Sequence, residues 1–127
     1  GIMAAILIVD DSSSTRIQLR NFLEPHKHTC TEAVNGLDAL EKLNNGPIDL
    51  IICDLNMPEM DGLEMVRLVH GDEELTGIPI LMLTTEASKA SKEIGKDAGV
   101  VAWITKPFKP EKVVSAVERI LKRQNKA

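Results

Sequence analysis

The sequence has few of the features that mark membrane, disulfide-bonded or nucleic-acid-binding proteins. No apolar run approaches the roughly 20 residues of a transmembrane helix, and no basic segment with a long apolar stretch opens the chain. Cys30 and Cys53 are the only cysteines and form no Cys-x-x-Cys pair, so we expect reduced thiols and no zinc site. The 15 Lys and Arg residues are dispersed in a chain of net charge -4, which argues against nucleic-acid binding. We expect a cytoplasmic protein that binds neither nucleic acid nor membranes.

The length and apolar content are those of one domain. The chain has 127 residues, of which 43% are apolar, and it contains no linker, repeat or low-complexity segment. We therefore treat residues 1–127 as a single domain. Gly1 and Ile2 precede Met3, and we interpret them as a cloning remnant.

Short apolar runs alternate five times with segments in which apolar residues recur at helical spacing. The runs predict strands at 5–9, 28–33, 50–53, 78–83 and 100–105. Helices are predicted after each of them, carrying in turn Ile17 to Leu23, Leu37 to Leu43, Leu63 to Val69, residues 88–98, and Val113 to Leu121. This alternation predicts an α/β fold, a doubly wound five-stranded parallel sheet with helices on both faces, in the flavodoxin-like order 2-1-3-4-5.

The predicted helix at 88–98 differs from the others because it has few apolar residues. Ile94 is its only large aliphatic side chain, so we expect Ile94 to be its one strong anchor. Gly99 is expected to end the helix. A weakly packed helix costs little to shift, and we expect this one to be the loosest.

Five polar residues follow predicted strands and should meet at one edge of the sheet. Asp10 and Asp11 follow the first strand, Asp54 the third, Thr84 the fourth and Lys106 the fifth. In this strand order the first and third strands are neighbours at the switch point, where ligands bind. Each residue alone has a simpler interpretation, such as a turn cap for Asp54 or a solvated charge for Lys106. Their common placement is what indicates a site.

Three close carboxylates without His or Cys favour a hard divalent cation such as Mg²⁺. With Mg²⁺ and Lys106 present, the formal charge of the group is near zero. Such a setting suits attack by Asp54 on a phosphoryl group, with the Thr84 hydroxyl donating to a phosphoryl oxygen. The product would be an aspartyl phosphate.

The same residues resemble the receiver domain of two-component response regulators. The resemblance rests on Asp10-Asp11, the Asp54-x-x-x-Pro58 loop with Asp61-Gly62, Thr84, and Lys106-Pro107-Phe108, and it spans essentially the whole chain. Asn56, Glu86 and the lack of an attached output domain make the chain most similar to the single-domain chemotaxis regulators of that family.

The resemblance implies a site and a set of partners. Asp54 would accept phosphate from a histidine kinase, and the protein would catalyse only its own phosphorylation and dephosphorylation. Asp11, Asp54 and the Asn56 carbonyl would bind Mg²⁺, with Asp10 acting through water. The Lys106-Pro107 peptide bond would be cis. Expected partners are the kinase, a flagellar motor switch protein or other output protein, and a phosphatase. The protein itself is expected to be a monomer.

Two positions, Trp103 and Thr85, depart from the family's pattern. Trp103 stands where the family's switch uses Tyr or Phe together with Thr84, or it is simply a half-exposed aromatic packed on the sheet edge. Thr85 replaces a usual Ala or Gly and would narrow the approach to Asp54. Asn56, Thr85 and Glu86 are the expected residues of access and dephosphorylation.

Other interpretations fit less well. An aspartyl-phosphate hydrolase of the haloacid dehalogenase kind needs an Asp where Asn56 stands, and a flavodoxin-type module would not place Asp10-Asp11 beside a flavin phosphate. We expect His26 and His28 to be solvated or strand-edge residues with no further ligand nearby. A phosphate sink or phosphorelay intermediate, without motor binding, remains open as the alternative output.

Overall fold

The computed structural model describes residues 2–125. Gly1, half of the suggested cloning remnant, lies outside this range, whereas Ile2 packs against the core. The strands are β1 (Ala5–Val9), β2 (Thr29–Ala33), β3 (Leu50–Cys53), β4 (Ile80–Thr84) and β5 (Ala102–Thr105). The helices are α1 (Ser13–Leu23), α2 (Gly36–Leu43), α3 (Gly62–His70), α4 (Lys89–Ala98) and α5 (Pro110–Gln124), with a short 3-10 helix η1 (Glu24–His26) after α1.

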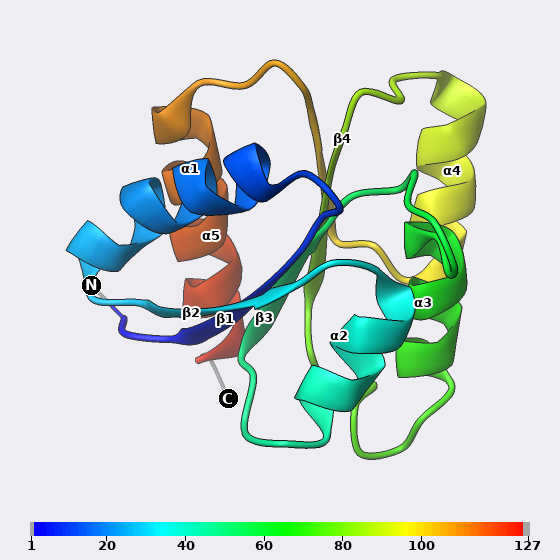
Figure 1. Cartoon of the computed structure of the whole chain (residues 1–127), viewed down its shortest axis with the longest axis horizontal. Helices are drawn as coiled ribbons and strands as arrows, with labels where there is room; N and C mark the ends of the chain where they lie inside the picture. Colours follow the sequence, from blue (N-terminus) through cyan, green and yellow to red (C-terminus); the bar gives the residue numbers. More distant parts are fainter. Residues whose placement is uncertain (1, 126–127) are drawn as a thin grey trace.

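The five strands form one parallel sheet in the order β2-β1-β3-β4-β5, which confirms the predicted fold. Helices α1 and α5 cover one face, and α2, α3 and α4 cover the other (Figure 1). No helix within residues 2–125 has the length and apolar character needed to cross a membrane.

Successive residues of the central strands point to opposite faces of the sheet, and both faces are buried. In β1, Ile6 and Ile8 join the core under α1 and α5, whereas Leu7 and Val9 join the core under α2 and α3. All four residues of β3 are buried. This is why the strands appear in the sequence as continuous apolar runs without polar alternation.

Most helices begin at a side chain that accepts a backbone hydrogen bond. Ser12, Asn35, Asp61 and Ser88 each accept from the N–H three residues later, at the starts of α1, α2, α3 and α4. Helix α5 instead begins with Pro110, whose missing N–H needs no partner there. The capping residues therefore determine where these four helices begin, which is close to the carboxyl edge of the sheet.

Helix α4 packs differently from the prediction. Ile94 is 46% exposed and does not anchor the helix, and the one buried residue of α4 is Gly95. A Cβ added at Gly95 would lie 2.8 Å from Cζ3 of Trp103, so the indole ring fills the space against the helix backbone. The prediction was wrong because the bulk at this contact comes from β5, which leaves the helix to contribute its smallest residue. Gly99, in the left-handed region, ends α4 as expected.

His28 also differs from the prediction. His26 is exposed, but His28 is buried at the start of β2. Its Nδ1 accepts a hydrogen bond from the Ala4 N–H at 3.2 Å, and its Nε2 lies 3.2 Å from Oε1 of Glu118 on α5. The imidazole thus joins β1, β2 and α5 and has a structural place in the core.

Candidate functional site

Asp54 follows β3 at the carboxyl edge of the sheet. Its N–H donates to the Val9 carbonyl at 2.9 Å, which continues the β1–β3 pairing by one residue. Its side chain is 11% exposed. Helix α3 begins directly against it, because a Cβ at Gly62 would overlap the Asp54 carbonyl oxygen, and the Gly62 N–H donates to the Leu55 carbonyl at 2.8 Å. The backbone of Asp54 is therefore fixed by packing and hydrogen bonds, while a small part of its carboxylate is exposed to solvent.

Asp10 and Asp11 complete a group of three carboxylates with Asp54. Each residue offers one oxygen atom, and these atoms lie within 4.8 Å of one another. Asp10 and Asp54 are buried, whereas Asp11 is exposed. Among residues 2–125 this is the one cluster of three or more acidic, His or Cys side chains with metal-binding geometry. The predicted convergence of three acids at the switch point is present.

Lys106, directly after β5, supplies the positive charge. Its Nζ donates to Oδ2 of Asp10 at 2.8 Å and lies 3.5 Å from Oδ2 of Asp54. Burial is the strongest single influence on the ammonium group and lowers its pKa, but the hydrogen bond and charge of Asp10 and the charge of Asp54 together raise that pKa above its usual value. The lysine therefore carries its charge across the physiological pH range. The Lys106-Pro107 bond is cis, as the resemblance implies.

The end of β4 joins the site to β5 and α4. Thr84 is the last residue of β4 and is fully buried, and its Oγ1 accepts from the Glu86 N–H at 3.3 Å. The Glu86 carbonyl in turn accepts from Nε1 of Trp103 at 2.9 Å. Within residues 2–125 the Thr84 hydroxyl makes no hydrogen bond to Asp54. Thr85 and Asn56 are exposed at the same edge, on the β4–α4 and β3–α3 loops.

Comparison with known proteins identifies the family to which this arrangement belongs. A family model described as the response regulator receiver domain matches residues 6–118. The chain belongs to the receiver domain family. The receiver domain is 39% identical over 121 residues to chemotaxis protein CheY of Pseudomonas aeruginosa, covering 94% of this chain and 98% of that protein.

Two further relatives are of the same kind. Chemotaxis protein CheY1 of Helicobacter pylori is 41% identical over 118 residues, covering 91% of this chain and 95% of that protein. The solved structure of chemotaxis protein CheY4 of Vibrio cholerae superposes with a TM-score of 0.88 at 39% identity, covering 94% of the receiver domain and 99% of that chain. The receiver domain thus spans nearly the full length of these relatives.

The residues of the acidic cluster fit the Mg²⁺ that is typical of receiver domains. The available donors are all oxygens, which hard divalent cations prefer. The Asp11 carboxylate accepts no hydrogen bond from any residue in the described range, so its oxygens are free to take a ligand. Within residues 2–125 the Asp54 carboxylate has one partner, the Lys106 ammonium at 3.5 Å. Two of the three carboxylates therefore keep coordination capacity.

Sequence reasoning missed three contributors to the site. Arg16 of α1 donates from Nη1 to the Asp10 carbonyl at 2.7 Å, and the Ser12 N–H donates to Oδ1 of Asp10 at 2.9 Å. Gly62 was recognised as part of a loop motif, but its close approach to Asp54 was not. A helix that starts after two acids and carries an Arg one turn inside was the available signal for Arg16.

Proposed function

We propose that Asp54 is the phosphoacceptor of a response regulator in a two-component system. The geometry at the end of β3 supports this proposal. The observation that carries the proposal is a slightly exposed carboxylate with two acidic neighbours within 4.8 Å and a lysine ammonium at 3.5 Å. Neither a turn cap nor a structural ion pair needs this combination. The similarity to chemotaxis proteins CheY and CheY1 supports a role in chemotaxis signalling.

The reaction is a transfer from a histidine kinase. An Asp54 oxygen attacks the phosphorus of a phosphohistidine, the P–N bond breaks, and the imidazole leaves with the electron pair and takes up a proton. Asp11, Asp54 and the Asn56 carbonyl would hold Mg²⁺, with Asp10 acting through water, and the ion would neutralise phosphoryl charge. Lys106 adds positive charge beside Asp54, and the Thr84 hydroxyl donates to a phosphoryl oxygen after leaving its present partner, the Glu86 N–H.

Intact-mass measurement with acetyl phosphate tests the acceptor role. We expect one added phosphoryl group only when Mg²⁺ is present. Asp54→Asn should abolish the addition without unfolding the protein, and Asp11→Ala should weaken Mg²⁺ binding most. Undiminished Mg²⁺-dependent phosphorylation of Asp54→Asn would remove the assignment.

The structure offers a route by which phosphorylation would reach a partner-binding surface. The Glu86 backbone joins Thr84 to Trp103, because its N–H donates to Thr84 Oγ1 at 3.3 Å and its carbonyl accepts from the indole at 2.9 Å. The indole packs on Gly95 of α4. Drawing the Thr84 hydroxyl toward a phosphoryl group would free the Glu86 N–H. The backbone of Glu86 and the indole bonded to its carbonyl could then change position, and α4 with them.

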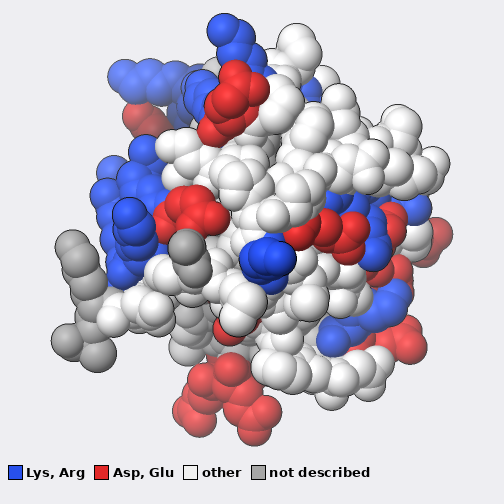
Figure 2. Space-filling model, turned by 90° about the vertical axis from the view of Figure 1, so that its left-hand side faces the viewer, with Lys and Arg blue, Asp and Glu red and all other residues white. Residues whose placement is uncertain are grey.

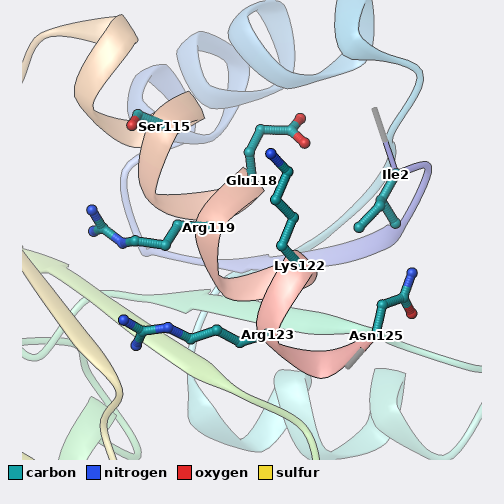
Figure 3. Close-up of a pocket in the computed structure, with 7 residues that line it drawn as sticks. All are labelled: Ile2, Ser115, Glu118, Arg119, Lys122, Arg123 and Asn125. Atoms are coloured by element: carbon teal, nitrogen blue, oxygen red, sulfur yellow. The ribbon is translucent and has the colours of Figure 1, made fainter. Parts of the chain in front are cut away.

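The surface beyond Trp103 is basic with an apolar centre. Lys92, Lys96 and Arg123 line a hollow of about 470 Å³ around Val101, which is 53% exposed. None of these three cations forms a salt bridge with residues in the described range. Arg119 and Arg123 extend to the same side of α5, and Lys122 points to another side near Glu118 (Figure 3). This chemistry fits an acidic partner segment with an apolar side chain.

Lys and Arg side chains also gather at the left of the face that Figure 2 shows. The net charge of the protein is -4, so this gathering is a local reversal of the overall sign. A local field of this kind raises association rates with partners of opposite charge.

A flagellar motor switch protein and a histidine kinase are the partners to test, in binding measurements with and without beryllofluoride and Mg²⁺. Arg123→Glu should weaken binding of the output partner and reduce its dependence on salt. Arg67→Glu on α3 is the matched control, since Arg67 is exposed on another helix. If the beryllofluoride-loaded protein binds only the kinase, the phosphate-sink or relay role replaces the motor-binding role.

A further inference from the structure

Each polar group of Asp10, in its backbone and its side chain, makes a hydrogen bond. Its N–H donates to the Ala33 carbonyl at 3.1 Å, its Oδ1 accepts from the Ser12 N–H, and its Oδ2 accepts from Lys106. Its carbonyl oxygen accepts from Nη1 of Arg16 at 2.7 Å. Among residues 2–125, the bond from Arg16 alone acts on the peptide unit that joins Asp10 to Asp11.

Asp11 has no comparable support. Its side chain is exposed and accepts no hydrogen bond within residues 2–125. Its backbone, which sets the direction of the Cα–Cβ bond, therefore decides which region the carboxylate can reach. Because the peptide unit is planar, fixing the Asp10 carbonyl also fixes the N and Cα atoms of Asp11.

Arg16 can hold that peptide because its own guanidinium is fixed at a second point. Nε donates to Oε1 of Glu32 on β2 at 2.8 Å, and the Arg16 side chain is only 13% exposed. Glu32 is fixed in turn, because its Oε2 accepts from Arg20 at 3.1 Å and its backbone carbonyl accepts from Lys42 at 3.3 Å. Two separate nitrogens at a set angle make this bridge, which a lysine ammonium on a flexible stem does not reproduce.

We propose that Arg16 is a positioning residue for the acidic cluster: by bridging Glu32 and the Asp10 carbonyl, it orients the Asp10–Asp11 peptide and so directs the Asp11 carboxylate toward Asp54. Its effect on metal binding rests on the proposed function, whereas its effect on the peptide does not. The competing explanation is that Arg16 only attaches α1 to β2.

The matched pair of variants is Arg16→Met and Arg20→Met. Both remove a bond to Glu32 from α1, but only Arg16→Met removes the bond to Asp10. In the metal-free protein, Arg16→Met should accelerate exchange of the Ser12 amide, which is bonded to Asp10, about tenfold, and Arg20→Met should leave it unchanged. Arg16→Lys should resemble Arg16→Met, since it cannot bridge the two acceptors.

Mg²⁺ titration calorimetry gives the second measurement. Groups that position metal ligands typically change affinity by about 10- to 100-fold, and we expect a loss of about tenfold in Arg16→Met against less than twofold in Arg20→Met. Glu32→Gln keeps an acceptor oxygen and should lie between them.

The two measurements separate failure of the inference from failure of the proposed function. If the wild type itself binds no Mg²⁺, the proposed function fails, and the exchange rate of the Ser12 amide then decides the role of Arg16. Equal exchange in Arg16→Met and the wild type overturns the inference. Equal losses of Mg²⁺ affinity in Arg16→Met and Arg20→Met also overturn it, because they would indicate a general loosening of α1.

Discussion

Replacing Gly95 by Ala should displace the Trp103 indole while changing the free energy of unfolding only a little. The new Cβ would lie 2.8 Å from Cζ3 and 3.3 Å from Cε3 of the indole. Carbon atoms prefer about 3.5–4.0 Å, so the ring and the helix must separate by about 1 Å. Overpacking of this kind costs about 1–3 kcal/mol. The removal of a helical glycine offsets about 1 kcal/mol of that cost. The free energy of unfolding should therefore fall by about 0–2 kcal/mol.

The assay combines urea unfolding with fluorescence of Trp103, the only Trp in a chain that has no Tyr. The indole is half-buried and bonded to Glu86, so its displacement should shift the emission maximum and alter the response to beryllofluoride with Mg²⁺. Asp97→Ala, at an exposed position of α4, is the control. It should stabilise the helix by about 0.5 kcal/mol and leave the emission unchanged.

A Gly95→Ala protein that gains about 1 kcal/mol with unchanged emission would refute the reasoning. That outcome would mean that only helix propensity changed. The contact between α4 and the indole would then not exist in solution, and with it the proposed route from Thr84 to the output surface would fail.

Two substitutions and one labelling experiment test other parts of the structure. Thr85→Ala should speed both phosphorylation from small donors and loss of phosphate; unchanged rates would make Thr85 a surface residue without a role. Gly62→Ala should lower the free energy of unfolding in urea by about 2 kcal/mol or more, because the added Cβ overlaps the Asp54 carbonyl; wild-type stability would contradict that contact. Burial, followed by the charge of Glu24, raises the pKa of the Cys30 thiol from 9.0 to about 11. Alkylation of native Cys30 at pH 8 should therefore be about 100-fold slower than for an unperturbed thiol. The stabilisation from this shift is present below pH 9 and is lost as the pH rises toward 11, and fast native alkylation would count against the burial of Cys30.

The strands were predictable from local signals, and the convergence of the acids followed from the order 2-1-3-4-5, which is common for a five-stranded doubly wound sheet. Continuous apolar runs mark strands buried on both faces, and breaks such as Asp10-Asp11 and Lys106-Pro107 mark their ends. Once the strands are parallel and in the order 2-1-3-4-5, the residues at the carboxyl ends of β1, β3, β4 and β5 must share an edge. Asp10, Asp54, Thr84 and Lys106 reach the site by this rule alone.

The contacts that depend on tertiary register were not predictable. The large aliphatic Ile94 lies outside because Trp103 occupies the contact with α4, and nothing within residues 88–98 reveals that. His28 is buried because Ala4 and Glu118, which are distant in sequence, come to its two ring nitrogens. The Arg16 bridge needs the pairing of β1 with β2, which brings Glu32 beside the end of β1.

The central claim is that Asp54 itself carries the phosphoryl group, and mapping the modified residue tests it most directly. The protein would be phosphorylated with acetyl phosphate and Mg²⁺, reduced at once with sodium borohydride, and digested for tandem mass spectrometry. Borohydride converts an aspartyl phosphate to homoserine, and we predict homoserine at position 54 and at no other aspartate. Homoserine at Asp10 or Asp11 with none at position 54, or phosphate found only on a Ser, Thr or His, would contradict the account.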